Sequence, residues 1–415
     1  MVASPRERTS TRNTNFQAMT LDSGDGEAPK TLSDADRRRS IAAAITCIAV
    51  FAITTGFASP LISLILEARG TDRTTIGAMA SVPALAILLS APFIPTMIRL
   101  MGIRPFLYGC IAIEFILFFA LPLFDNLAAW FIIRTLMGAS SSGLWVASET
   151  WINAVALDHN RGRVMAIYAM ILSGSFGLGP LIIVLIGTDG ALPFVIGAAF
   201  IATAALPVLW AGQLSPTFHG KASFGVWSFL LVAPTLAGAI WLSSVKEMAY
   251  GALLPVYGVR SGLVEADAAT LLTAAALGAV ILQWPIGWLV DRFNRYAILI
   301  ICASGGGIGV AMLPWLVAAG GIPMWLGMLF WGGVFSGVYT ASMAIVGQRF
   351  RGADLVAANA AFGFLWGAGS LTGPILTGAA MDIWDPHGFP AAITVLTVVF
   401  VVFAIARRVQ IRSRC

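Results

Sequence analysis

The feature that most constrains this chain is a series of apolar runs, each long enough to cross a lipid bilayer. The hydrocarbon core of a bilayer is about 30 Å thick, and a helix needs about 20 apolar residues to cross it. Twelve such runs stand between residues 41 and 407, without the period-2 alternation of membrane strands. The chain is therefore predicted to be an all-α membrane protein with twelve transmembrane helices. The predicted spans are 41–66, 75–98, 105–124, 127–152, 163–187, 191–211, 233–259, 268–290, 296–318, 322–346, 355–381 and 389–407.

Composition supports a membrane protein and excludes other classes. Of the 415 residues, 58% are hydrophobic and only 11% are charged, whereas soluble domains carry about 25% charged residues. A soluble enzyme, a nucleic-acid binder and a disordered scaffold are thereby excluded. The four cysteines lie in spans or at the C-terminus and suggest neither a disulfide framework nor a metal site. Nucleotide-binding and common hydrolase motifs are absent, so we expect no enzyme activity and no cofactor.

Charge and turn residues divide the chain into segments. Residues 1–40 hold 13 of the 45 charges and are polar throughout, as is typical of a disordered tail. The longest internal gap between spans, 212–232, contains glycine, proline and lysine and is interpreted as a linker. The predicted organisation is a cytoplasmic tail at 1–40, a six-helix bundle at 41–211, a cytoplasmic linker at 212–232, a second six-helix bundle at 233–407 and a cytoplasmic tail at 408–415.

The distribution of lysine and arginine predicts the orientation. If the N-terminus is cytoplasmic, 20 of the 25 Lys and Arg residues fall on the cytoplasmic side and only Arg69, Arg73 and Arg260 on the other. Such an excess is the positive-inside pattern. We therefore predict a multi-pass protein of the cytoplasmic (inner) membrane with both termini in the cytoplasm.

The two halves of the chain repeat each other at an offset of about 190–195 residues. Gly56-x-x-x-Pro60 in the first span matches Gly251-x-x-x-Pro255 in the seventh, and LGPLI at 178–182 matches TGPIL at 372–376. Because each half has six spans, corresponding helices run in the same direction. The repeat is therefore of the parallel kind, related by an axis along the membrane normal.

Several motifs make the chain resemble the major facilitator superfamily from residue 41 to 407. The resemblance rests on Gly287-x-x-x-Asp291-Arg292-x-x-Arg295 between two spans, Arg134-x-x-x-Gly138 in the fourth span, and the Gly-Pro pairs 179–180 and 373–374. The first-half copy of the first motif departs, with Pro95 and Arg99 in place of Gly and Asp. Segments 148–169 and 355–367 further resemble the YcaD-like branch.

The resemblance implies two pseudo-symmetric six-helix bundles that rock about a central site. It also implies a charge network at the cytoplasmic mouth that holds the outward-facing state, with Asp291 in the intact motif. Exposed ion pairs are worth about 0–1 kcal/mol each, so only a coordinated set could act as a gate. Topology signalling alone would also explain the arginines, and both interpretations stay open. The candidate gating charges are Asp291, Arg292, Arg295, Glu149, Arg161 and Arg163.

Ionisable residues inside spans are costly and usually face a partner or a cavity. Glu114 and Arg134 each stand about ten residues from the turn near 124–125, so they are expected at one level on adjacent antiparallel helices. They are either a coupled pair, in which proton arrival at Glu114 frees Arg134, or a static ion pair.

The fourth span carries one polar stripe. Arg134, Gly138, Ser141, Trp145 and Ser148 recur at helical spacing. The stripe is a candidate substrate wall, with Gly138 expected to serve helix packing instead.

The seventh span carries the other charges at membrane depth, Lys246 and Glu247, about twelve residues from its start near 234. We expect a binding or proton site here, with Tyr250 and Tyr257 available for hydrogen bonds. The alternative is a pair in which the two charges only satisfy each other.

Together these features predict a monomeric secondary active transporter of an unknown small molecule, working by alternating access without nucleotide hydrolysis. Proton coupling is placed on Glu247 or Glu114, and substrate contact on Lys246, Arg134 and Trp145. Efflux of amphipathic compounds is favoured, because the predicted cavity is apolar and aromatic. Two alternatives stay open, a lipid flippase on the same scaffold and a transport-dead membrane sensor or scaffold.

Overall fold

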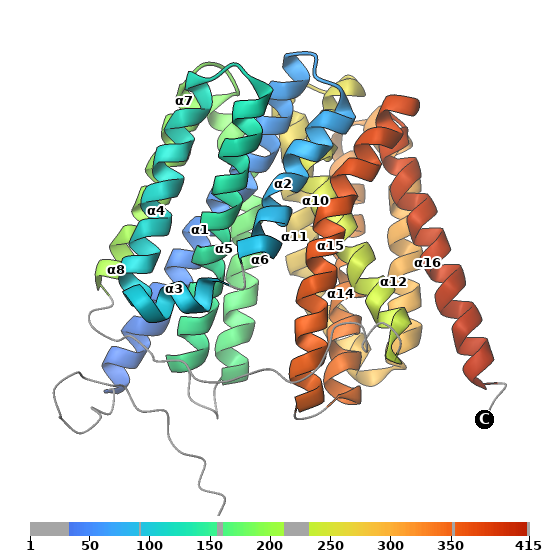
Figure 1. The fold of residues 1–415 in the computed structure, drawn as a ribbon. Helices are drawn as coiled ribbons and strands as arrows, with labels where there is room; N and C mark the ends of the chain where they lie inside the picture. Colours follow the sequence, from blue (N-terminus) through green and yellow to red (C-terminus); the bar gives the residue numbers. More distant parts are fainter. Residues whose placement is uncertain (1–32, 91–92, 156–160, 211–231, 351–352, 413–415) are drawn as a thin grey trace, which may run out of the picture.

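The computed structural model describes residues 33–90, 93–155, 161–210, 232–350 and 353–412, and its regular elements are all helices (Figure 1). The first half contains α1 (Asp34–Ala68), α2 (Arg73–Ser90), α3 (Ile94–Met101), α4 (Ile103–Ala120), the 3-10 turn η1 (Leu121–Leu123), α5 (Leu127–Val155), α6 (Arg161–Ile186), α7 (Leu192–Thr203) and α8 (Ala205–Trp210). The second half contains α10 (Pro234–Arg260), α11 (Glu265–Arg292), α12 (Arg295–Ala311), α13 (Leu313–Ala319), α14 (Gly321–Arg349), α15 (Ala353–Ile383) and α16 (Gly388–Arg412). Most of the predicted tail at 1–40 and of the linker at 212–232 lies outside the described residues.

Each predicted span coincides with one helix or with one interrupted helix pair. Within the described ranges, seven helices are long and apolar enough to cross a membrane by themselves. The number becomes eight if α12 and α13, which meet at a bend of 50°, count as one span. The all-helical membrane architecture is confirmed, and the count of twelve crossings stays a prediction.

The second predicted span, 75–98, is wrong as one continuous helix. Helix α2 ends at Ser90, and the short helix α3 begins at Ile94 with Pro95 in its first turn. A proline interrupts a continuing helix because it lacks the N–H donor and clashes with the preceding turn. Helix α3 ends at Met101 and is followed by Gly102, whose φ of 84° is a conformation that favours glycine.

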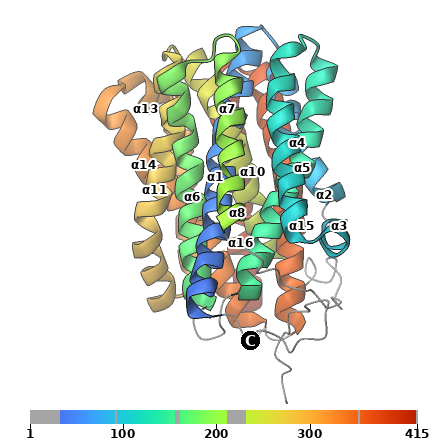
Figure 2. The ribbon, with the colours of Figure 1, turned by 90° about the vertical axis from the view of Figure 1, so that its left-hand side faces the viewer.

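Corresponding helices of the two halves make corresponding contacts, which confirms two pseudo-symmetric bundles (Figures 1 and 2). Helix α1 packs on α6 as α10 packs on α15, and α4 packs on α5 and α7 as α12 packs on α14 and α16. Two glycines permit the first of these close approaches. Gly179 abuts the backbone of α1 at Gly56, and Gly373 abuts the backbone of α10 at Val245, with no room for a Cβ.

The start of α1 and the end of α16 lie on one side of the molecule (Figure 1), which we call the terminal face. The opposite side, where α1 ends and α2 begins, is the far face; the predicted orientation makes it the external one. The halves meet along α2–α15, α6–α11 and α1–α10. In the first of these contacts Gly77 of α2 abuts the backbone of Pro374, and Gly378 of α15 abuts the backbone of Arg73.

Candidate functional site

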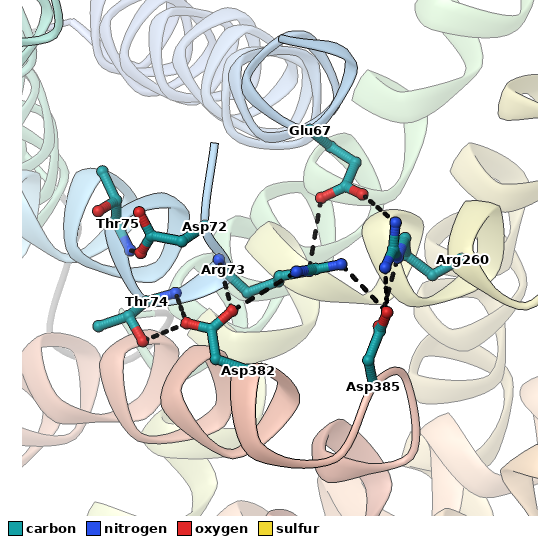
Figure 3. Close-up of polar contacts among 8 residues, drawn as sticks. All are labelled: Glu67, Asp72, Arg73, Thr74, Thr75, Arg260, Asp382 and Asp385. Carbon is teal, nitrogen blue, oxygen red and sulfur yellow. Dashed lines mark hydrogen bonds and ion pairs between the residues drawn. The ribbon is translucent and has the colours of Figure 1, made fainter. Parts of the chain in front are cut away.

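Five charged residues at the far face join the two halves (Figure 3). Glu67 lies at the end of α1 and Arg73 begins α2, both in the first half. Arg260 ends α10, Asp382 lies in the last turn of α15, and Asp385 follows that helix, all in the second half. We call Glu67, Arg73, Arg260, Asp382 and Asp385 the clasp.

Each arginine of the clasp reaches carboxylates of both halves. The Arg73 guanidinium lies 3.1 Å from Asp385 Oδ2 and 3.7 Å from Asp382 Oδ1. Arg260 donates from Nε to Asp385 Oδ1 over 3.3 Å and makes a second contact with Oδ2. Glu67 is held less closely, at 3.5 Å from Arg260 and 3.9 Å from Arg73. The clasp is therefore a connected network across the interface and not a single surface pair.

Asp382 also caps a helix of the other half. Its Oδ1 accepts from the Arg73 amide over 3.0 Å, and its Oδ2 accepts from the Thr74 amide over 2.9 Å and the Thr74 hydroxyl over 2.6 Å. The first amides of a helix have no partner within the helix and carry partial positive charge, so a carboxylate stabilises them. Because the cap comes from α15, the start of α2 is fully satisfied only while the halves are together.

A second contact line joins α6 to α11 near the same face. The Thr188 hydroxyl donates to Glu265 over 2.8 Å, and the Thr273 hydroxyl donates to the carbonyl of Gly177 over 2.9 Å. Arg73, Thr74, Arg260, Thr188 and Thr273 thus make hydrogen bonds or ion pairs between the halves in the far-face part of the molecule. The halves are therefore locked together at the far face.

The clasp was not predicted from the sequence. Arg73 and Arg260 stood out only as two of the three cations on the far side, and Asp382 and Asp385 belong to no motif. One signal was available: these residues stand at helix ends that the predicted topology brings to the same face. Which of them meet depends on how the two halves pack, and residues more than 300 positions apart leave no local pattern.

Lys246 and Glu247 form a pair near the middle of α10. Lys246 Nζ lies 2.7 Å from Glu247 Oε2, and the Lys246 side chain is only 6% exposed. Its ammonium also lies 5.0 Å from the ring centre of Tyr250 and 5.3 Å from that of Phe335, within the range of cation–π attraction. The two charges are therefore paired, as the alternative interpretation expects, and the binding or proton site stays a prediction. The Tyr250 hydroxyl has no hydrogen-bond partner, so Tyr250 contributes its ring and not the expected hydrogen bond.

Glu247 is unusual along its helix. Its side chain is 52% exposed, while every other residue of α10 up to Val259 is buried or half-buried. Helix α10 contacts α1, α2, α11, α14, α15 and α16 and is thus surrounded by both halves. Glu247 is therefore exposed at the middle of a helix that packs against both halves.

The expected direct pair of Glu114 and Arg134 is not formed. Both side chains are buried, and Glu114 accepts a hydrogen bond from the Ser141 hydroxyl, two turns beyond Arg134 on α5. Side chains tilt toward the N-terminus of their own helix. On antiparallel helices, Glu114 and Arg134 therefore point in opposite directions along the membrane normal. One carboxylate oxygen of Glu114 and the Nε of Arg134 are left buried without a hydrogen-bond partner.

The polar stripe of the fourth span lies on α5. Arg134 and Ser148 are buried, whereas Ser141 and Trp145 are half-buried. Gly138 abuts the backbone of Pro83 in α2, which confirms its packing role. Ser141 and Trp145 are therefore the more accessible members of this candidate substrate wall.

The predicted gating charges lie at the terminal face. Arg295 is 3.9 Å from Asp291 and donates to the carbonyl of Ala344 and to Gln348, each over 3.0 Å, while Arg292 stacks on Trp288. These contacts all remain within the second half. Glu149 is half-buried on α5. Arg161 and Arg163 lie in the first turn of α6, and their side chains are outside the described part of the chain.

The comparisons with known proteins agree with this architecture. The family model of the Major Facilitator Superfamily matches residues 44–332 and 236–413. The chain belongs to the major facilitator superfamily. Among its relatives, the MFS-type transporter YfkF of Bacillus subtilis is 24% identical over 354 residues, covering 82% of this chain and 88% of the relative. The MFS-type transporter YcaD of Escherichia fergusonii is 27% identical over 271 residues, covering 62% of this chain and 67% of the relative.

Solved structures of the superfamily share the fold. A bacterial homologue of the human lysosomal transporter Spinster, in an inward-facing unoccupied conformation, superposes with a TM-score of 0.70 at 14% identity, covering 90% of this chain and 96% of the other. The nucleoside transporter NupG superposes with a TM-score of 0.68 at 16% identity, covering 89% and 98%. The superfamily fold and a multi-pass membrane protein are thereby established, and membership supports secondary transport.

Proposed function

We propose that this protein is a proton-coupled secondary transporter that moves a small molecule by alternating access. One observation supports this proposal best: Glu247 is exposed at mid-helix while its partner Lys246 is buried against aromatic rings. A proton that binds Glu247 removes the negative charge that balances Lys246. The ammonium is then available to an anionic or polar group of the substrate, so proton and substrate are linked through one ion pair.

Glu114 is the second proposed proton site. It is buried, accepts a hydrogen bond from the Ser141 hydroxyl and interacts electrostatically with Arg134. A proton that binds Glu114 would remove the negative charge that acts on this arginine. Arg134, also buried, and the half-buried Trp145 are the proposed substrate contacts from the first half.

The clasp supports an alternating mechanism. It holds the halves together at the far face, which under the predicted orientation makes this an inward-facing state. Opening that face must break the clasp and the cap on α2. The charges around Asp291 would then form the opposite gate in the outward-facing state, and export is the favoured direction.

The proposal is tested by finding a ligand and then measuring coupling. A thermal-shift screen of the purified protein identifies candidates, because a ligand that binds the folded state stabilises it by mass action. Uptake of a confirmed ligand into proteoliposomes should increase with an imposed pH gradient, and this increase should be lost in Glu247→Gln. Uptake that ignores the gradient and is unchanged in Glu247→Gln contradicts proton coupling. Lipid movement independent of the gradient would instead support a flippase.

A further inference from the structure

The clasp contains more acidic than basic groups. Its five side chains are three carboxylates and two guanidiniums. Each guanidinium already has a close carboxylate partner from the second half: Asp385 for both, and Asp382 for Arg73. The clasp therefore has one carboxylate more than it has guanidiniums, and Glu67 is the carboxylate with the weakest pairing.

Glu67 is also the least solvated of the three carboxylates. Its side chain is 11% exposed, compared with 28% for Asp382 and 33% for Asp385. Its Oε2 is buried and receives no hydrogen bond. An ionised carboxylate that is buried, weakly paired and close to other carboxylates binds a proton more readily than a free one.

The surroundings of Glu67 add acidic groups and a route to solvent. A partly open cavity of about 380 Å³ lies against Glu67, Arg260 and Asp385, and Glu265 of α11 also lines it. The neighbouring Arg69 does not compensate, because it pairs with Asp125 over 3.5 Å. The charged groups around Glu67 are Arg69 on its own helix end, Asp72 and Arg73 at α2, Arg260 at α10, Glu265 at α11, and Asp382 and Asp385 at α15.

We infer that Glu67 is a proton-binding site that controls the clasp, so that a proton from the far side stabilises the closed far face. The carboxylates that act most directly on Glu67, those of Asp382 and Asp385, belong to the second half. When the halves separate, Glu67 leaves them and returns to water at the end of α1, where a carboxyl group is ionised. The closed state therefore binds the proton more tightly, and by linkage the proton favours the closed state.

This inference rests on the alternating access of the proposed function and extends it. It places a proton site on the far face, separate from Glu247 and Glu114. A proton that arrives from outside would close the external face behind it, as inward proton movement requires.

The test measures the fraction of closed far face as a function of pH. Spin labels are placed on A128C at the start of α5 and V264C before α11, both exposed, in the full chain with C415S. The other three cysteines are buried and stay unlabelled. Electron paramagnetic resonance in nanodiscs then gives the populations of short and long distances between pH 8 and pH 5.

The closed-to-open ratio of the wild type should rise as pH falls, by up to about tenfold per pH unit, because one proton is linked to closure. Glu67→Gln, which imitates the protonated group, should stay closed and lose this response. Asp385→Asn leaves two carboxylates for the two guanidiniums of the clasp without a bound proton. This variant should therefore also lose most of the pH response. Asp189→Asn, which changes an exposed far-face carboxylate outside the clasp, should keep the wild-type slope.

A wild-type ratio that does not respond to pH overturns the inference, and so does an unchanged slope in Glu67→Gln. A failure of the proton coupling proposed for Glu247 can be distinguished from a failure of this inference about Glu67. Glu247→Gln should keep the pH response of the far face even if it abolishes proton-driven transport.

Discussion

A single methyl group at Gly77 should push the two halves apart at the far face. Gly77 lies on α2 where the backbone of Pro374 in α15 crosses it. A Cβ at this position would lie 2.7 Å from the carbonyl carbon of Pro374 and 3.2 Å from the amide nitrogen of Ile375, with the Pro374 oxygen closer still. These atoms are backbone atoms of a helix and cannot move aside alone, so the helices must separate.

The free-energy cost of this steric overlap can be estimated. Overpacking at a tight contact typically costs about 1–3 kcal/mol. Because α2 and α15 belong to different halves, the cost falls on the closed state and is absent when the far face opens. The closed-to-open ratio should therefore fall by about 5-fold to 150-fold, since about 1.4 kcal/mol corresponds to a factor of ten.

The assay is the distance distribution between labels at A128C and V264C, measured in Gly77→Ala and in a matched control. Gly174→Ala on α6 is the control, because a Cβ there meets no atom within 4 Å. Both changes replace a helical glycine by alanine, so the gain in helix propensity is common to both. Gly77→Ala should populate the long distance and Gly174→Ala should not. A wild-type distribution in Gly77→Ala would refute the assignment of α2–α15 as the closing contact.

Three further predictions concern thermal unfolding in nanodiscs. Lys246→Ala should destabilise the protein by about 1–3 kcal/mol through lost packing and cation–π attraction, and Lys246→Met, which keeps the packing volume, should cost less. Ser141→Ala removes the hydrogen bond to buried Glu114 and should cost about 1–3 kcal/mol; adding Glu114→Ala should cost less than the sum of the single changes. Trp331→Phe removes the 2.9 Å bond from the indole to the carbonyl of Gly306 and should cost about 1–2 kcal/mol. Equal melting temperatures of a variant and the wild type would contradict the corresponding contact.

The sequence predicts those parts of the fold that follow from local physical rules. Apolar runs of span length locate the helices, because an unpaired backbone group is too costly in lipid. The repeated Gly-Pro pairs locate the equivalent close contacts of Gly179 with α1 and Gly373 with α10. The pairing of Lys246 with Glu247 was also predictable, since two adjacent opposite charges at membrane depth have few other partners.

The remaining parts depend on directions and distances that a linear pattern does not contain. Counting residues from the turn placed Glu114 level with Arg134, but Glu114 accepts its hydrogen bond from Ser141, because each side chain tilts along its own helix. To predict the break between α2 and α3, Pro92 and Pro95 would have to be given more weight than the apolar run around them. The clasp depends on the docking of one bundle against the other, which no local rule predicts.

The most direct test of the central claim is a measurement of proton movement during transport. Proteoliposomes loaded with a pH-sensitive dye receive a confirmed ligand without any imposed gradient. The account predicts a ligand-dependent pH change inside the vesicles for the wild type and none for Glu247→Gln. Transport of the ligand with no accompanying pH change, at equal rates in both proteins, would contradict it.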